Sequence, residues 1–235
     1  MKIALIGYGK MGKEIESIAL SRGHEIVYKI NRANAHLLDT GNFKTVDVAI
    51  EFSTPDTVVS HIEKCLQASV PVVVGTTGWY QHFDAVKQQC TEKNGGLFYA
   101  TNFSVGVNLF FKINTALAML MNRYSDYEVS MEEIHHVHKL DKPSGTAITL
   151  ANQIIAEIDR KHQWSITDKS ADTLFIHDVR EGEVPGTHII KYHSAIDDIE
   201  IMHKAHNRKG FAMGAVLAAE FLAGKKGIYS MSDII

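Results

Sequence analysis

The sequence has little of three features that would each define a class of protein. It has two cysteines, Cys65 and Cys90, in 235 residues, and their spacing fits no metal motif, so we expect two reduced thiols. No apolar run reaches the ~20 residues of a membrane-spanning helix. The net charge of −3 provides no basic surface for nucleic acid. Because Met1 leads directly into a strand pattern, we expect no signal peptide and a cytoplasmic protein without membrane or nucleic-acid partners.

The first forty residues have the pattern of a dinucleotide-binding fold. A short apolar strand, 2–6, is followed by the letters GYGKMG and by a helix pattern over 13–21. A G-x-G-x-x-G run between a first strand and a first helix indicates a turn that cradles a pyrophosphate. An ordinary glycine-rich turn is the alternative. The predicted cofactor contacts here are Gly7, Tyr8, Gly9, Lys10, Met11 and Gly12.

The end of the second predicted strand, 25–30, bears on the choice of cofactor. An acidic residue at this point holds the ribose hydroxyls of NAD. This chain has Asn31 and Arg32 instead, and a guanidinium can pair with a 2′-phosphate. The sequence therefore predicts a preference for NADPH over NADH, unless Arg32 is simply a solvated loop residue.

Strands and helices alternate as far as residue 100, after which the pattern changes. Strands are predicted at 46–52, 70–74 and 97–100, with helices over 57–68 and 80–93, as in a parallel sheet. The second part has a long apolar helix at 108–122 and a helix at 144–160. It also has predicted strands at 127–134, 173–180, 186–194 and 198–203, and a last helix at 210–223. We expect a substrate-binding domain inserted into the dinucleotide-binding fold.

The stretch from Glu132 to Ala147 concentrates charged and polar groups. It contains three histidines and two lysines before Pro143 and Ser144, which fit a helix start. A helix that begins at Ser144 would offer the backbone N–H groups of Gly145 and Thr146 to a carboxylate or phosphate. A zinc site, a solvated polar loop and a pH-sensing histidine cluster are the alternatives, and because the lysines would repel a cation we expect no metal.

The residues EIHHVHK (133–139) and PSGTA (143–147) resemble the signature of the dihydrodipicolinate reductase family, with Val137 where many members have arginine. The resemblance implies that His135 is the proton donor and that Lys139 is a second donor, a charge stabiliser or only a carboxylate ligand. It further implies that His136, Gly145 and Thr146 bind substrate carboxylates. The family's cofactor segments match Gly75, Thr76 and Thr77, and also Ala100, Thr101, Asn102 and Phe103. Relatives of this kind are tetramers, so a homotetramer is expected.

These observations combine into one prediction of fold and function. The fold class is α/β, with a Rossmann-like parallel sheet and an α+β domain that has a mostly four-stranded open mixed sheet. The dinucleotide-binding domain takes 1–103 and about 208–235, and the domain for substrate binding and oligomerisation takes about 104–207. The function is NAD(P)H-dependent reduction of 4-hydroxy-tetrahydrodipicolinate, a small cyclic dicarboxylate, to tetrahydrodipicolinate. The alternatives are another imine-type amino-acid dehydrogenase, which would not need the histidine loop, and a non-catalytic NAD(P)-sensing protein.

Overall fold

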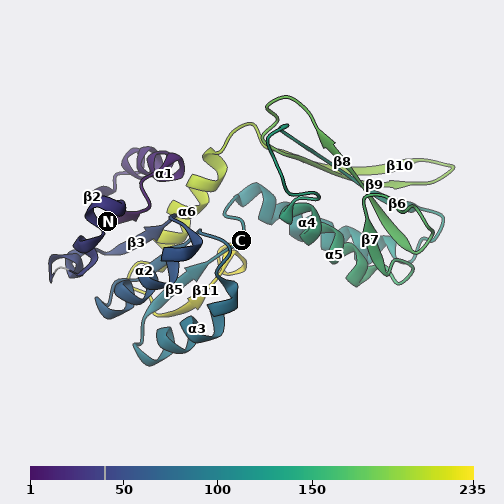
Figure 1. Cartoon of the computed structure of the whole chain (residues 1–235). Helices are drawn as coiled ribbons and strands as arrows, with labels where there is room; N and C mark the ends of the chain where they lie inside the picture. Colours follow the sequence, from purple (N-terminus) through teal and green to yellow (C-terminus); the bar gives the residue numbers. More distant parts are fainter. Residues whose placement is uncertain (40) are drawn as a thin grey trace. The chain divides into compact units, whose positions relative to one another are not determined.

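The chain folds as two compact units, each with its own sheet and core (Figure 1). The computed structural model describes residues 1–39 and 41–235, except for the side chain of Asn42. The first unit comprises Met1–Val105 and Arg208–Ile235, and the second comprises Gly106–Asn207. The second unit is thus inserted into the first in the order of the chain.

The first unit contains a six-stranded sheet in which all neighbours run parallel, in the order β11-β5-β4-β3-β1-β2. Its strands are β1 (Lys2–Ile6), β2 (Glu25–Ile30), β3 (Val48–Glu51), β4 (Val72–Val74), β5 (Gly96–Tyr99) and β11 (Gly227–Tyr229). Its helices are α1 (Lys10–Ser21), α2 (Pro55–Gln67), α3 (Phe83–Glu92) and α6 (Lys209–Leu222). Short 3₁₀ helices lie at Arg32–Asp39, Gly41–Thr45, Tyr80–His82 and Met231–Asp233.

Both faces of this sheet are covered, which explains why its central strands are apolar throughout. One core cluster joins the sheet to α2 and α3, and the other joins it to α1 and α6. The order of the strands reverses at β1, between β2 and β3. In open α/β sheets, ligands bind at the carboxyl ends of the strands beside such a reversal.

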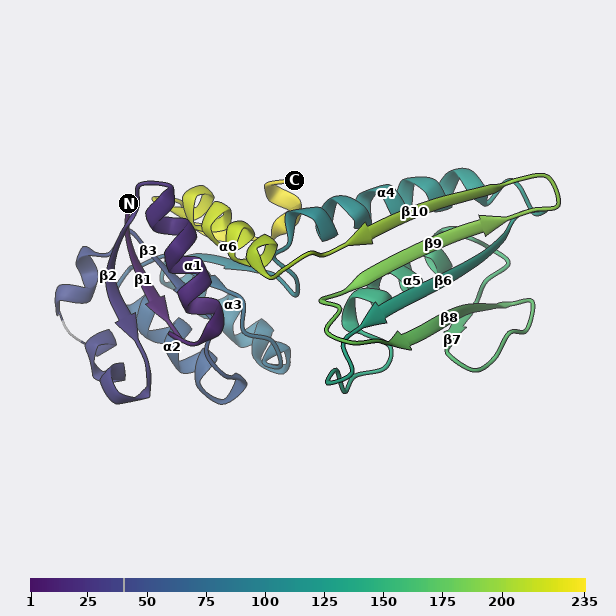
Figure 2. The same ribbon diagram turned by 90° about the horizontal axis from the view of Figure 1, so that it is seen from above.

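The second unit contains a mixed sheet of five strands in the order β10-β9-β6-β8-β7. The strands are β6 (Glu128–His135), β7 (Gln163–Ser165), β8 (Thr173–Arg180), β9 (Thr187–His193) and β10 (Asp198–Lys204). Helices α4 (Val105–Met121) and α5 (Gly145–Glu157) cover one face of this sheet (Figure 2). On β6 every second side chain faces these helices: Val129 and Met131 pack in the core, and Glu133 and His135 follow on the same face.

Within the described residues, the predicted helices and strands are all present, with ends shifted by a few residues. Two strands of three residues each, β7 and β11, were not predicted, because neither has the apolar run that identified the equally short β4. Helix α1 begins at Lys10 and not at Lys13, since Gly9 is its extended N-cap residue. Among the described residues, no helix is long and apolar enough to cross a membrane.

Candidate active site

A cavity of about 600 Å³ lies in the first unit at the reversal of strand order. The loops after β1, β2 and β3 form it, and its lining includes Gly7, Gly9, Asn31, Arg32, Ser53 and Thr54. The carboxyl ends of three neighbouring strands thus provide one concave surface. Its place in the sheet is the place where this class of fold binds a dinucleotide.

The turn after β1 cannot accommodate a side chain at Gly7. Its φ of +92° belongs to the left-handed region, and a Cβ atom there would lie 2.0 Å from the carbonyl oxygen of Phe52. Gly12 packs as closely, since its Cβ would lie 2.6 Å from the carbonyl oxygen of Gly7. At Gly9 a Cβ would meet no atom within 4 Å, so this stretch of backbone is open to a ligand.

Three side chains of this turn, those of Tyr8, Lys10 and Met11, were also predicted to contact the cofactor, and each has a different environment. The Tyr8 hydroxyl donates to the Glu16 carboxylate, and Lys29 Nζ lies 2.5 Å from Glu16 Oε1. Lys10 is exposed at the start of α1, whereas Met11 packs against the core. Tyr8 is therefore oriented by a charged pair on α1 and β2, and Lys10 has the exposure that a phosphate contact would need.

Asn31 and Arg32 differ in how their side chains are used. Asn31 Oδ1 accepts a hydrogen bond from Ala33 N at 2.9 Å, and Asn34 Oδ1 accepts from Asn31 N at 2.7 Å. The Asn31 amide thus holds the turn after β2, where an NAD-binding acid would stand. Arg32 is exposed on the wall of the cavity. Its guanidinium is in a suitable place for an additional phosphate.

The segments after β4 and β5 are partly structural. Thr76 is buried, and its hydroxyl accepts from Ser53 N at 2.8 Å, which ties the loop after β4 to the loop after β3. Gly75 is half-buried, and Thr77 is exposed. After β5, Thr101 is exposed, Asn102 is half-buried, and Ala100 is buried. The Phe103 ring packs on Phe52 and Phe98, so a cofactor contact at this position would have to come from the backbone.

In the second unit, the histidine loop connects the end of β6 to the start of α5. Ser144 is the N-cap of α5, and its hydroxyl accepts from Ala147 N at 3.1 Å, as predicted for this residue. Gly145 is exposed, and a Cβ there would meet nothing within 4 Å. Thr146 follows in the first turn of the helix. An anion can therefore approach this helix start closely, and the helix dipole favours it.

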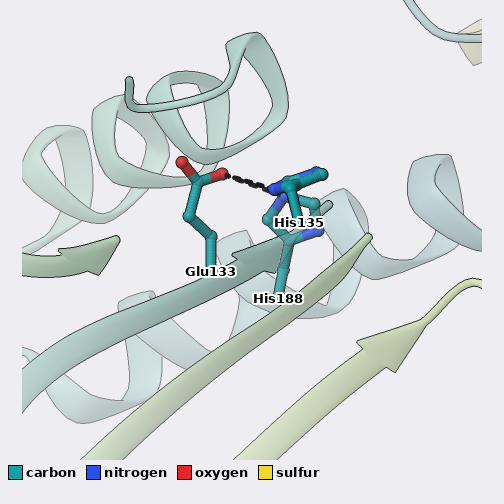
Figure 3. A group of neighbouring side chains, drawn as sticks. All are labelled: Glu133, His135 and His188. Carbon is teal, nitrogen blue, oxygen red and sulfur yellow. Dashed lines mark ion pairs between the residues drawn. The ribbon is translucent and has the colours of Figure 1, made fainter. Parts of the chain in front are cut away.

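His135, the last residue of β6, belongs to a buried cluster of acid and imidazole groups (Figure 3). Its Nδ1 atom lies 3.4 Å from Glu133 Oε2, and His188 Nε2 lies 3.6 Å from the same oxygen. The other oxygen, Oε1, accepts from Ser144 N at 2.8 Å and lies 3.7 Å from Arg180 Nη2. Four strands and loops thus bring their polar groups to one carboxylate.

The cluster changes the pKa of both partners. Burial lowers the pKa of His135 to about 4, against the opposing effect of the Glu133 charge, so the ring is neutral at pH 7 when the site is empty. Burial alone would raise the pKa of Glu133. The His188 ring and the hydroxyl and backbone N–H of Ser144 outweigh burial, and the pKa of Glu133 stays below its usual range. Glu133 is therefore a buried anion.

Lys139 and His136 lie in the loop itself. Lys139 Nζ forms an ion pair with Asp141, 2.8 Å from Oδ1, and is only partly exposed. Arg180 holds this part of the loop, because it donates to the carbonyl oxygen of Asp141 at 2.6 Å. His136 is half-buried, and its Nδ1 atom has no hydrogen-bond partner within the part of the chain that the structure describes.

The ligand-type atoms of Glu133, His135 and His188 lie within 4.8 Å of one another, a spacing that a metal ion could use. One oxygen of Glu133 already accepts a hydrogen bond from Ser144 N and faces the Arg180 guanidinium. A resident cation is thus next to the carboxylate. We therefore interpret the three side chains as an acid–imidazole cluster.

Comparison with known proteins identifies the family. The model for the N-terminal part of dihydrodipicolinate reductase matches residues 1–103, and the model for its C-terminal part matches residues 106–235. The chain belongs to the dihydrodipicolinate reductase family. It is therefore an oxidoreductase with a nicotinamide cofactor.

Relatives in this family match over nearly the whole chain. The 4-hydroxy-tetrahydrodipicolinate reductase of Christiangramia forsetii is 46% identical over 100% of this chain and 98% of its own length. The enzyme of the same name from Neisseria meningitidis is 33% identical over 94% of this chain and 83% of its own length. A dipicolinate-bound dihydrodipicolinate reductase from Paenisporosarcina sp. TG-14 superposes with a TM-score of 0.78 at 25% identity, over 100% of this chain and 99% of that one. The reductase fold thus extends across both units.

Within this reductase fold, the structure brings most of the predicted residues into two groups, and it adds residues to which the sequence assigned no role. Glu133, His188 and Arg180 belong to the second group, around His135. Glu133 lies directly opposite His188 in the β6–β9 pair, and His135 lies opposite Arg180 in the β6–β8 pair. The sequence did contain one signal for this group. Glu133 and His135 are two positions apart at the end of a predicted strand, so both side chains had to lie on the same face of the sheet.

The first group also has an unpredicted member, the buried Glu51 at the end of β3. Its Oε1 atom accepts from the Ser53 hydroxyl and lies 3.2 Å from His61 Nδ1. Ser53 and His61 both line the cavity. Glu51 thus fixes two polar side chains on the wall of the cavity.

Proposed function

We propose that this protein reduces 4-hydroxy-tetrahydrodipicolinate to tetrahydrodipicolinate with NADPH, in the biosynthesis of diaminopimelate and lysine. The observation that carries the proposal is that His135 ends β6 and that His136 and Lys139 lie in the loop that follows it and leads into the N-terminus of α5. Such a loop offers proton donors, fixed positive charge and an anion-binding helix start to a small cyclic dicarboxylate. Membership of the reductase family supports the same reaction.

The residues of the second unit have distinct roles in this proposal. Reduced nicotinamide supplies the hydride when it is bound. His135 donates the proton, and Lys139 stabilises the negative charge that develops as the hydride arrives. His136 and the backbone of Gly145 and Thr146 bind the carboxylates of the substrate.

The substrate itself makes His135 a proton donor. In the empty site the ring is neutral at pH 7, because burial disfavours its charged form. A bound dicarboxylate brings negative charge next to the ring and favours its protonation. The same carboxylates compete with Asp141 for Lys139, so the ion pair within the loop opens as the substrate binds.

The first unit holds the cofactor, and its side chains favour NADPH. The cofactor contacts we propose are the turn from Gly7 to Gly12, Arg32, Gly75 to Thr77 and the segment from Ala100 to Phe103. Arg32 is an exposed cation on the cavity wall, and the neighbouring Asn31 is neutral and holds its own turn. A 2′-phosphate finds a partner here, whereas no acid stands at the end of β2 to hold ribose hydroxyls.

The proposal extends to assembly and location. The outer strand of the second sheet, β10, pairs only with β9 among the described strands, and Met202 on it is 56% exposed. An open edge with apolar side chains needs cover, which favours a homotetramer formed through these sheets. Cys65 and Cys90 are both unpaired thiols in the core, as is usual in the reducing cytoplasm.

A steady-state assay tests the proposal. Purified protein should oxidise NADPH when freshly generated 4-hydroxy-tetrahydrodipicolinate is supplied, and should not oxidise it without that substrate. Dipicolinate, the stable aromatic dicarboxylate, should inhibit in competition with the substrate. An absence of cofactor oxidation by folded protein with fresh substrate would falsify the assignment.

A further inference from the structure

The carboxylate of Glu133 contacts the two functional parts of the second unit at once. Its side chain is completely buried on β6. Oε1 accepts a hydrogen bond from Ser144 N, at the start of α5, and Oε2 lies 3.4 Å from Nδ1 of His135. One rigid group therefore links the helix that is to bind the substrate anion with the ring that is to donate the proton.

His188 strengthens this link from the neighbouring strand. It lies opposite Glu133 in the β6–β9 pair, with Nε2 3.6 Å from Glu133 Oε2 and 3.3 Å from the Ser144 hydroxyl. That hydroxyl caps α5 through Ala147 N. His188 thus bridges the carboxylate and the cap of the helix.

The His135 ring has little freedom to turn. Its ring centre is 5.2 Å from that of His188, in an edge-to-face arrangement. A Cβ atom at Gly186 would lie 3.0 Å from His135 Nε2, closer than an ordinary contact, so the glycine gives the ring space. In this position Nδ1 of the ring lies towards Glu133, 3.4 Å from Oε2.

The charges around His135 come from every element that packs on it. They are Glu133 on its own strand, His188 on β9, Arg180 on β8 and Lys139 in the following loop. Glu133 is the only anion among these four groups. It is also the one group whose charge favours the protonated ring, whereas the other three disfavour it.

We propose that Glu133 is the positioning residue of the proton donor, and that His188 is the positioning residue of the anion-binding helix start. Glu133 accepts a hydrogen bond from Nδ1–H of the charged His135 ring, which leaves the Nε2 proton for transfer and stabilises the charge. His188 holds Ser144, and through it the first turn of α5. Both roles rest on the proposed reductase function, since they assume that His135 donates a proton to a bound dicarboxylate.

The isosteric variant Glu133→Gln separates charge from capping. The amide oxygen can still accept from Ser144 N, while the amide NH₂ replaces the charged oxygen at His135. We expect the pH above which kcat declines to move down by about one unit or more, the shift typical of losing an opposite charge at this distance. At neutral pH, kcat should fall about tenfold or more, because fewer rings carry the proton. The KM for NADPH should not change.

The matched control is Glu132→Gln, the same substitution one residue away. Glu132 lies on the opposite face of β6 and pairs with His177 at 2.7 Å. This variant should keep the kcat and the pH profile of the wild type. Equal effects of the two substitutions would overturn the proposal, because they would reflect a general loss of negative charge on β6.

The variant His188→Ala tests the second half of the proposal. It removes the support of Ser144 but keeps the Glu133 charge, so the KM for the substrate should rise about tenfold. The pH above which kcat declines should not move down, because His188 disfavours the protonated His135 ring. A pH shift as large as that of Glu133→Gln, with an unchanged KM, would show that His188 acts on His135 and would overturn its assigned role.

Two further measurements keep these outcomes distinct from other failures. The pKa of the His135 ring, followed by NMR in the absence of ligands, should be lower in Glu133→Gln than in the wild type, and this comparison needs no activity. If the wild type proves inactive, the proposed function fails while the NMR result still decides the role of Glu133.

If Glu133→Gln does not fold, Glu133→Asp provides a second test. This variant should fold, with a reduced kcat and with the wild-type position of the pH profile. A wild-type kcat for Glu133→Asp would contradict the proposal. Activity should survive dialysis against a chelator, and its loss and recovery with zinc would replace the positioning role by metal binding.

Discussion

The two units build their sites from different parts of the chain. In the first unit, the site consists mainly of backbone in loops after parallel strands, where glycines allow a close approach. In the second, it consists of side chains brought together by strand pairing, with a buried charge at its centre. A backbone site is vulnerable to added bulk, whereas a paired-strand site is vulnerable to lost charge.

Adding one methyl group should show the vulnerability of the first unit. Gly7→Ala places a Cβ 2.0 Å from a carbonyl oxygen at a φ of +92°, so the turn has to move. We expect the affinity for NADPH to fall about 10²-fold or more, since strain of a few kcal/mol at this turn opposes the bound shape. Titration of NADPH fluorescence measures it.

Gly23→Ala provides the control for the backbone angle alone. Gly23 also has a positive φ, +79°, but its Cβ would meet no atom within 4 Å. This variant should bind NADPH like the wild type, with only a slightly lower Tm. If both variants bind the cofactor equally well, close packing at Gly7 has no part in the site.

Removing one ring should show the vulnerability of the second unit. His135→Ala should lower kcat by about 10²-fold or more, as for a lost general acid, with a modest effect on KM. Lys139→Ala should behave similarly, and His136→Ala should mainly raise the KM for the substrate. His177→Ala, on the exposed side of the same sheet, is the control. A wild-type kcat for His135→Ala would contradict the role assignment.

Acid should destabilise the protein through the second unit. The pKa of His135 is about 4 in the fold and about 6.5 in the unfolded chain, so the unfolded chain binds the extra proton between these values. The free energy of unfolding therefore has its full value above pH 6.5 and decreases as the pH drops towards 4. The decrease between pH 7 and pH 5 is about 2 kcal/mol. Thermal unfolding at both pH values measures this loss. His135→Gln should reduce it, and the remainder should reflect His203, whose pKa burial also lowers.

The smallest expected effect lies on the cavity wall of the first unit. Arg32→Ala should lower kcat/KM for NADPH about tenfold and leave that for NADH nearly unchanged, because one exposed charge-assisted contact is lost. Arg123→Ala, an exposed arginine of the second unit, is the control. A wild type that favours NADH, with no response to the Arg32 substitution, would contradict the predicted preference.

This contrast also explains how much the sequence predicted. The cofactor turn is contiguous, so the spacing of Gly7, Gly9 and Gly12 was enough to predict its place after β1. Ser144 was likewise predicted as a cap from its neighbours alone. The roles that the family resemblance implied for His135 and Lys139 stay predictions, although the structure places His135 at the end of β6 and Lys139 in the loop that follows.

What the sequence did not indicate depends on register. Glu133 and His188 are 55 positions apart, and only the pairing of β6 with β9 makes them neighbours. Strand lengths and periods do not determine which residues face each other across two strands. Phe103 shows the opposite case. It was predicted as a cofactor contact from its motif, but its ring packs in the core. The sequence could place the motif but not the direction of that side chain.

The insertion of the second unit has a consequence for synthesis on the ribosome. Helix α6 covers one face of the first sheet, and it is made only after the 102 residues from Gly106 to Asn207. At about 5–20 residues per second, that delay is about 5–20 s. During this time Leu5, Ile50 and Phe98 lack their partners on α6. The unit made first is thus completed last, and a nascent chain has to keep an apolar face from aggregating until its final helix emerges.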